Sequence, residues 1–255
     1  MALLVHGQPG QGSDWENVAV DLTSSNRVLV PDRPGYGRTG GRAVGLAANA
    51  DSLDRLLDDK GVDSATVVGH SYGGGVALAM ALRHGDRVGA LVLVSSVGTG
   101  RSIGPYDRLL GLPVLGEGLA FAGMELSRRL LPPLRRRSAQ LPPAVGSWLR
   151  AIPEPSVPSD GGRRHGGETW RSFVTEQRAL LAETPSLEAG LGSVQVPTAV
   201  VAGRRDRLVP ARASAELAEA IPGAELVWLA GVGHLLPQEA PGPLVEIVRR
   251  YASGR

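Results

Sequence analysis

The pentapeptide Gly69-His-Ser71-Tyr-Gly73 carries the strongest chemical signal in the chain. The β-branched run Ala65–Val68 precedes it and the helical pattern Gly73–Arg83 follows it. A sharp turn between a strand and a helix lifts a serine hydroxyl above the sheet, where it can act as a nucleophile. The alternative is a chance match in a chain with 35 glycines, but it leaves the flanking strand and helix unexplained. The pattern therefore predicts that Ser71 is a nucleophile.

A neutral serine is a weak nucleophile and needs a general base, which an acid in turn orients. In chains with this turn the order is serine, acid, histidine. Of the five histidines, His234 fits, because Gly231-Val-Gly-His234 follows the last apolar run, where a loop at the carboxyl edge of the sheet would place it. The alternative for His234 is a histidine in a surface loop. The other four lie in different motifs, at a helix end or in a glycine-rich stretch: His6, His70, His84 and His165.

The acid should lie between Ser71 and His234, at the end of a strand. Asp206 meets both conditions, because it directly follows the apolar run Thr198–Ala202. It would hold the imidazole in one tautomer without taking up the proton itself. The alternative for Asp206 is a turn or cap before the next helix. Asp32 also follows a strand, but the surrounding Pro31-Asp-Arg-Pro-Gly-Tyr-Gly37 predicts a structural turn.

His6-Gly-Gln-Pro-Gly10 follows the first apolar run and predicts an oxyanion hole. Acyl transfer builds negative charge on a carbonyl oxygen, and preorganised donors stabilise that charge. The backbone N–H of Gln8 is one candidate donor, and Pro9 cannot donate. The backbone N–H of Tyr72, next to the nucleophile, is the second. A plain glycine-rich turn is the alternative for this segment.

These residues need a scaffold, and the chain alternates short apolar runs with helical patterns. Such alternation is typical of a parallel sheet in an α/β protein, with helices on both faces. The expected strands are Ala2–Val5, Arg27–Val30, Ala65–Val68, Ala90–Val94, Thr198–Ala202 and Glu225–Leu229. The expected helices are Trp15–Leu22, Ala47–Asp59, Gly73–Arg83, Ala211–Ala220 and Pro243–Tyr251.

Residues 98–194 contain no convincing strand and predict a largely helical cap inserted into the core, which comprises residues 1–97 and 195–255. Leu109–Leu131 is helix-like and rich in leucine, so its apolar residues are expected to line a pocket or to form the core of the cap. Prolines interrupt the following stretch, and Gly161–Gly167 is expected to be a loop.

The chain resembles the α/β-hydrolase superfamily, in the branch of esterases, peptidases and carbon–carbon hydrolases with a His-Gly-x-x-Gly loop. Four motifs occur in the order of that family: His6–Gly10, Asp32–Gly37, Gly69–Gly73, and Asp206 with His234. The resemblance implies a three-layer α/β/α fold with a mostly parallel sheet and a helical cap. The dehalogenases and epoxide hydrolases of the superfamily use an aspartate nucleophile, so a serine at position 71 speaks against both activities.

Members of the superfamily usually have two further strands before the His-Gly loop, whereas this chain begins at the strand of that loop. The resemblance therefore implies six parallel strands, with Arg27–Val30 as an open edge. An apolar open edge favours pairing with other chains. We expect either an upstream extension of the chain or a homodimer through this strand, so the choice between monomer and homodimer stays open.

Composition limits the possible partners and locations of the protein. The chain has 255 residues with 27 Lys or Arg against 25 Asp or Glu, so its charge is close to balanced and does not favour nucleic-acid binding. It has no cysteine, no signal-like start and no apolar run of about 20 residues. We expect a cytoplasmic location, no membrane association, and no metal or other cofactor, with a small molecule as the partner.

The leading functional hypothesis is hydrolysis of a small, apolar carboxylic ester, or an amide, through an acyl-Ser71 intermediate. The same triad could instead serve carbon–carbon bond hydrolysis, lyase chemistry or perhydrolysis, because specificity depends on the pocket walls. A third hypothesis is a binding protein with a hydrolase fold and little turnover.

Overall fold

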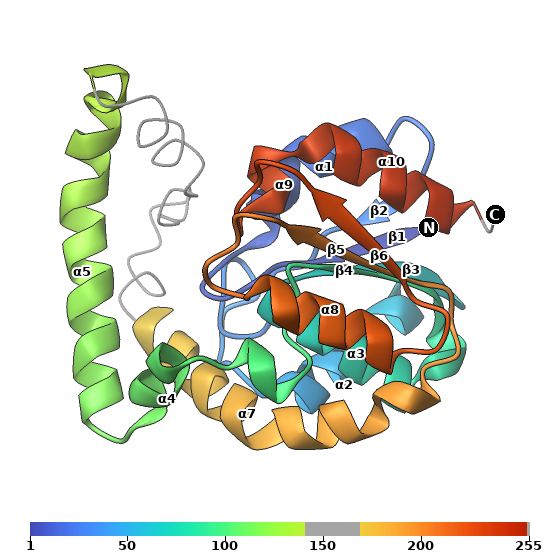
Figure 1. Cartoon of the computed structure of the whole chain (residues 1–255), viewed down its shortest axis with the longest axis horizontal. Helices are drawn as coiled ribbons and strands as arrows, with labels where there is room; N and C mark the ends of the chain where they lie inside the picture. The colour runs from blue at the N-terminus through green and yellow to red at the C-terminus, as the bar shows by residue number, and fades with distance from the viewer. Residues whose placement is uncertain (141–168, 254–255) are drawn as a thin grey trace.

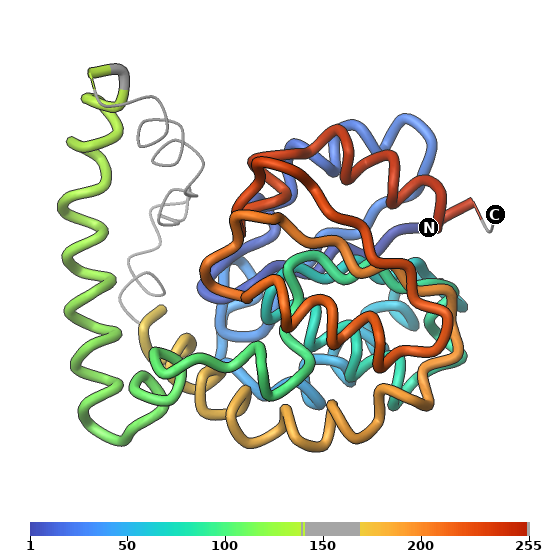
Figure 2. The backbone as a smooth tube through the Cα atoms, viewed as in Figure 1, coloured from blue at the N-terminus to red at the C-terminus, as the bar shows by residue number. Residues whose placement is uncertain are grey.

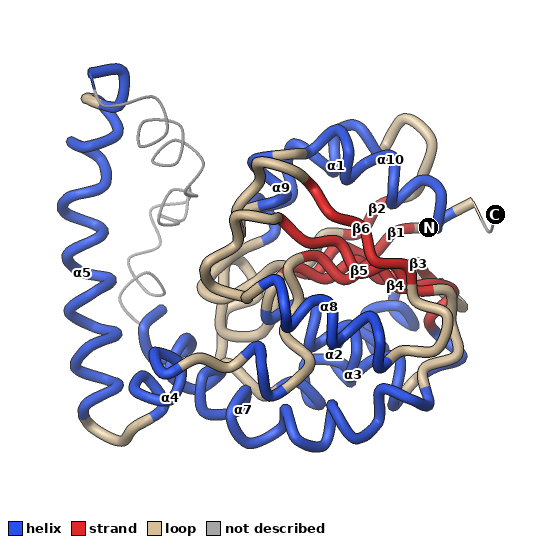
Figure 3. Tube along the Cα trace, viewed as in Figure 1, coloured by secondary structure: helices blue, strands red, loops and turns tan. Residues whose placement is uncertain are grey.

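The computed structural model describes residues 1–140 and 169–253. Their centre is one sheet of six parallel strands, in the order β2-β1-β3-β4-β5-β6. The expected parallel α/β sheet is therefore confirmed (Figure 3). The strands are β1 (Ala2–Val5), β2 (Val28–Leu29), β3 (Ala65–His70), β4 (Val88–Val94), β5 (Thr198–Gly203) and β6 (Glu225–Leu229).

Helices cover both faces of the sheet, which gives three layers (Figure 1). On one face lie α1 (Glu16–Leu22), α9 (Leu236–Glu239) and α10 (Pro241–Ala252). On the other face lie α2 (Leu46–Asp59), α3 (Tyr72–Arg83) and α8 (Ala211–Ala220). Because the strands are parallel, all their carboxyl ends meet at one edge of the sheet, and that edge carries the candidate site.

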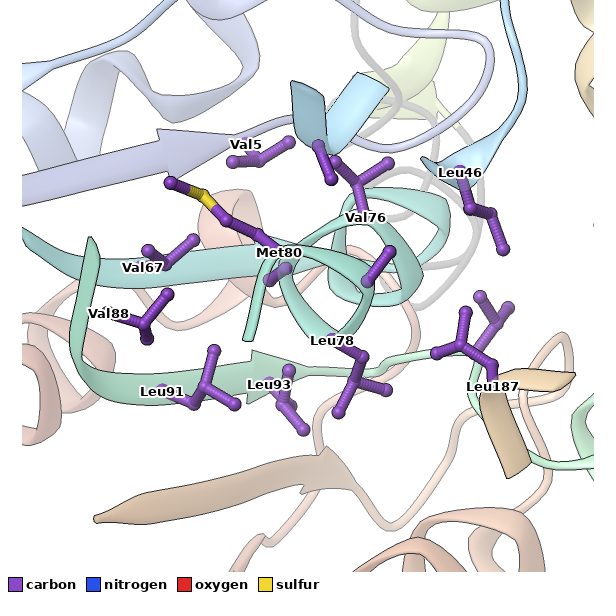
Figure 4. Close-up of a cluster of buried hydrophobic side chains, with 14 of the residues drawn as sticks. Val5, Leu46, Val67, Val76, Leu78, Met80, Val88, Leu91, Leu93 and Leu187 are labelled. Atoms are coloured by element: carbon purple, nitrogen blue, oxygen red, sulfur yellow. The ribbon is translucent and has the colours of Figure 1, made fainter. Parts of the chain in front are cut away.

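Each face of the sheet has its own buried apolar cluster. Alternate side chains of one strand enter opposite clusters, as the two-residue period of a strand requires. Leu3 and Val5 of β1 pack toward α2 and α3, whereas Ala2 and Leu4 pack toward α1 and α10. Met80 of α3 lies within the first cluster, close to the side chains of β3 and β4 (Figure 4). Burial on both faces explains why these strands appear as unbroken apolar runs in the sequence.

The edge strand β2 is shorter than its sequence pattern predicts. It comprises Val28 and Leu29 alone, and these pair with Ala2 and Leu3 of β1. Both side chains of β2 are half-buried. Strand β6 also lies at an edge of the sheet and keeps all five of its residues, so an edge position alone does not shorten a strand.

Between β4 and β5 the described residues form helices and no strand. The α-helices among them are α4 (Pro105–Gly111), α5 (Leu115–Arg136) and α7 (Thr169–Gly190). Helix α7 packs along α2 and α3, whereas α5 stands away from the sheet (Figure 2). The described part of the insertion is thus helical as expected, but Pro132 and Pro133 lie inside α5 and do not end it. Gly161–Gly167 and His165 lie outside the described residues.

The leucine-rich part of the insertion is mostly exposed, which argues against a cap core and does not test a pocket lining. Leu110 and Ala120 are buried, but most of the apolar side chains expected to form a lining or a core are exposed. They are Leu109, Leu112, Leu115, Leu119, Phe121 and Leu130.

Within the described residues no single helix is long and apolar enough to span a bilayer; α4 and α5 pass that test only as a pair, bent by 107°.

Candidate active site

Ser71 sits at the turn between β3 and α3, and its backbone is strained. Its φ of 54° and ψ of −119° lie in a region that residues with a side chain rarely adopt. The turn requires glycine on both sides. A Cβ on Gly69 would lie 2.3 Å from the carbonyl oxygen of Gly73, and a Cβ on Gly73 would lie 2.3 Å from that of Val5. The expected strand–turn–helix setting of Ser71 is present.

The structure brings Ser71, His234 and Asp206 together in one hydrogen-bonded series. Nε2 of His234 lies 3.0 Å from Oγ of Ser71, and Nδ1 of His234 lies 2.9 Å from Oδ2 of Asp206. The His234 side chain is 11% exposed and that of Asp206 is 2% exposed. This geometry allows the Ser71 hydroxyl to donate to His234 while His234 donates to the carboxylate.

Backbone contacts set Asp206 and His234 side by side. The loops after β5 and β6 are joined by hydrogen bonds from the Arg204 N–H to the Leu229 carbonyl and from the Arg205 N–H to the Val232 carbonyl. Helix α9 holds the same loop through Glu239. The Glu239 carboxylate accepts the backbone N–H groups on either side of His234, from Gly233 at 2.7 Å and from Leu235 at 3.2 Å. Sequence reasoning missed Glu239, although an acid five residues after a loop histidine is close enough to bind the backbone of that loop.

The two aspartates at strand ends differ in what they bind. Burial raises the pKa of Asp206, but hydrogen bonding and attraction from His234 outweigh it and hold this pKa below its ordinary value. Asp206 therefore remains a carboxylate beside the imidazole. Asp32 accepts backbone N–H groups from Gly12 at 2.7 Å and Arg38 at 2.8 Å, so the expected structural turn is confirmed.

The His6–Gly10 loop lies against the serine. A Cβ on Gly7 would be 3.1 Å from Cβ of Ser71, so the loop passes directly beside the nucleophile. In the described residues, no backbone carbonyl outside the helices and strands accepts a hydrogen bond from the N–H groups of Gln8 and Tyr72. Gln8 follows Gly7 and Tyr72 follows Ser71, so both N–H groups belong to residues next to the nucleophile and are the candidate donors of the oxyanion hole.

His70, inside the serine motif, has a role that sequence reasoning missed. It is 6% exposed, and its Nε2–H donates to the backbone carbonyl of His234 at 2.8 Å. Burial, followed by the neighbouring His234, lowers the pKa of His70 to about 3. His70 is therefore neutral at ordinary pH and anchors the loop of the candidate base. The signal was its place directly before Ser71, at the end of the strand that carries the nucleophile.

Protonation of His70 should weaken the fold in acid. The unfolded chain binds this proton near pH 6.5 and the folded chain only near pH 3, so the stability from neutral His70 is full above pH 6.5 and is lost as the pH falls toward 3. The expected loss between pH 8 and pH 5 is about 2 kcal/mol, at about 1.4 kcal/mol per pH unit below pH 6.5. His70→Gln, which keeps a donor, should lack this component. Denaturant unfolding at both pH values measures it, and equal losses in the two proteins would contradict a buried, neutral His70.

Residues 1–140 and 169–253 contain no group of three or more His, Asp or Glu side chains placed to hold a metal ion. The expectation that no metal or other cofactor takes part stays a prediction.

The sequence matches the family model of the alpha/beta hydrolase fold over residues 3–241. The chain belongs to the α/β-hydrolase family. It is 31% identical to 2-hydroxymuconate semialdehyde hydrolase of Pseudomonas putida, an alignment that covers 98% of this chain and 86% of that protein.

Solved structures of the family have the same fold. Est816, an N-acyl homoserine lactone degrading enzyme, superposes with a TM-score of 0.71 at 27% identity. The superposition covers 98% of this chain and 92% of the Est816 chain. A thermophilic esterase from Thermogutta terrifontis superposes with a TM-score of 0.72 at 24% identity, covering 98% of this chain and 88% of its own. Because the chain belongs to this family and its relatives are hydrolases, it is a hydrolase enzyme.

Proposed function

We propose that this α/β-hydrolase cleaves small carboxylic esters through an acyl-Ser71 intermediate. The observation that carries the proposal is the series of hydrogen bonds from Ser71 through His234 to Asp206. His234 accepts the proton of Ser71 as Oγ attacks the ester carbonyl carbon. The tetrahedral oxyanion accepts hydrogen bonds from the backbone N–H groups of Gln8 and Tyr72.

The second half of the reaction uses the same groups. His234 returns its proton to the leaving alcohol, the carbon–oxygen bond breaks, and the acyl group stays on Ser71. A water molecule then attacks the acyl-enzyme while His234 takes a proton from it, which releases the acid and restores the serine. Asp206 holds the imidazole throughout and stabilises its charged form.

Carbon–carbon bond hydrolysis is the second candidate. The 31% identity to 2-hydroxymuconate semialdehyde hydrolase favours it, because hydrolysis of that compound breaks a carbon–carbon bond. We place the ester first because it needs only the groups described above, and because Est816, at 27% identity, degrades a lactone, which is a cyclic ester.

A substrate panel separates the two candidates. p-Nitrophenyl esters with acyl chains from acetate to decanoate are compared with an N-acyl homoserine lactone, an amide and 2-hydroxymuconate semialdehyde, with Ser71→Ala as the blank. We expect the highest kcat/KM with a short, apolar acyl ester. Turnover of the semialdehyde with none of the esters would replace the ester proposal by the carbon–carbon candidate.

A further inference from the structure

A fully buried ion pair joins the helical insertion to the core. Arg33 lies in the loop after β2, Glu176 lies on α7, and both side chains are 0% exposed. The Glu176 carboxylate accepts from both terminal nitrogens of the guanidinium group and, at 2.7 Å, from the hydroxyl of Tyr36. Charged groups are rarely buried unless they are paired, so this pair holds the two segments in one arrangement.

Arg33 also forms hydrogen bonds with the loop that carries the proposed oxyanion donor Gln8. Its Nε–H donates to the His6 carbonyl at 3.0 Å, and a terminal guanidinium N–H donates to the Gly7 carbonyl at 2.9 Å. Its backbone N–H donates to Nε2 of His6 at 2.9 Å. The Gly7 carbonyl and the Gln8 N–H belong to the same planar peptide group. Fixing one therefore fixes the direction of the other.

The same guanidinium group lies near the second proposed donor. Its central carbon is 4.8 Å from the ring centroid of Tyr72, the residue that follows Ser71. On α7, the neighbour of Glu176 adds a second link to the loop, because Nε2 of Gln8 donates to Oε1 of Gln177 at 2.8 Å. Helix α7 thus contacts the oxyanion loop twice, through the charged Glu176 by way of Arg33 and through the neutral Gln177 directly.

We propose that Glu176 is a positioning residue that acts through Arg33 to aim the Gln8 N–H at the oxyanion. The helical insertion then helps to set the catalytic rate in addition to covering the core. This inference rests on the proposed function of Ser71. It predicts that loss of the Glu176 charge lowers kcat more than it changes KM.

Three variants test the proposal. Glu176→Gln removes the charge while keeping the shape of the side chain. The double variant Arg33→Met/Glu176→Met removes both charges, and such apolar replacement of a buried pair is often neutral for stability. Glu183→Gln is the matched control, because Glu183 lies on the same helix but accepts the backbone N–H of Ala47 at 2.9 Å, away from the loop. The readouts are kcat, KM, melting temperature and the rate at which a fluorophosphonate labels Ser71.

We expect Glu176→Gln to lower kcat and the labelling rate at least about 10-fold, with KM within threefold, since loss of a whole oxyanion donor costs about 10²–10³ in kcat. Glu176→Gln should also lower the melting temperature, because it leaves the Arg33 charge buried without its partner. In the double variant the melting temperature should return toward the wild-type value while kcat stays low. Glu183→Gln should keep kcat within twofold of the wild type. If the Glu176 variant does not fold, the double variant decides by the same criterion.

Recovery of wild-type kcat together with the melting temperature in the double variant would overturn the proposal and leave the pair a purely structural role. The labelling rate separates this failure from failure of the proposed function, because phosphonylation also places charge on an oxygen in the oxyanion hole. A wild-type protein that is labelled but cleaves no ester refutes the ester proposal and leaves this comparison valid. A wild-type protein that is not labelled refutes both.

Discussion

Ser71→Ala is expected to lower kcat by up to about 10⁶-fold, the loss typical when the nucleophile of such a triad is removed. Oγ of Ser71 lies 3.0 Å from Nε2 of His234, where it can donate its proton to the imidazole. Alanine can form no acyl-enzyme, so only the binding groups and the oxyanion donors would remain. Ester hydrolysis under saturating substrate measures the loss.

The same substitution should leave the fold intact. Alanine keeps the Cβ of Ser71 and meets the same backbone strain at φ 54°, so removal of one hydroxyl changes little packing. We expect a melting temperature within about 2 °C of the wild type. A variant with this melting temperature and more than a tenth of wild-type kcat would rule out Ser71 as the nucleophile.

Asp206→Asn should lower kcat by about 10⁴-fold, because the amide no longer favours the imidazole tautomer that can accept the serine proton. The carboxylate of Asp206 also accepts backbone N–H groups from Leu208 at 2.8 Å and Val209 at 2.9 Å through its other oxygen. An asparagine oxygen can keep those two bonds, so the loop should persist. The loss should therefore fall on kcat and much less on stability.

Asp32→Asn is the matched control, since it is the other aspartate at a strand end. Its two oxygens accept from Gly12 and Arg38, and an amide NH₂ cannot accept the second bond. We expect a loss of about 1–3 kcal/mol in unfolding free energy with nearly unchanged kcat. If Asp32→Asn is inactive while Asp206→Asn retains wild-type kcat, the acid has been assigned wrongly.

The sequence predicted the positions of the strands well where both faces of the strand are buried. Strands β3 and β5 are covered on both faces, so their apolar runs are continuous and their positions were predicted to within two residues. Strand β2 was overestimated, because the apolar run up to Val30 carries no local mark of where its pairing with β1 ends. The leucines of α5 are mostly exposed, and their pattern could not exclude a buried core because it does not state what the helix packs against.

The candidate triad could be located because each member stands in a local motif at a strand end. The ion pair that supports the neighbouring loop could not be located, because its two residues are far apart in the sequence. Glu176 and Arg33 are 143 positions apart and become a pair only when α7 docks on the core. A signal was present in α7, where Glu176 shares a helix face with the buried residues Leu180 and Thr184. A charge on an otherwise buried face indicates a buried partner without naming it.

Labelling with a fluorophosphonate tests most directly whether Ser71 is an activated nucleophile. The native protein is incubated with the probe, digested, and analysed by mass spectrometry, with Ser71→Ala and heat-denatured protein as controls. We predict that the peptide carrying Ser71 gains one phosphonyl group in the native protein alone. A native protein that stays unlabelled under conditions that label an ordinary serine esterase to completion would contradict the account and favour a binding protein with a hydrolase fold.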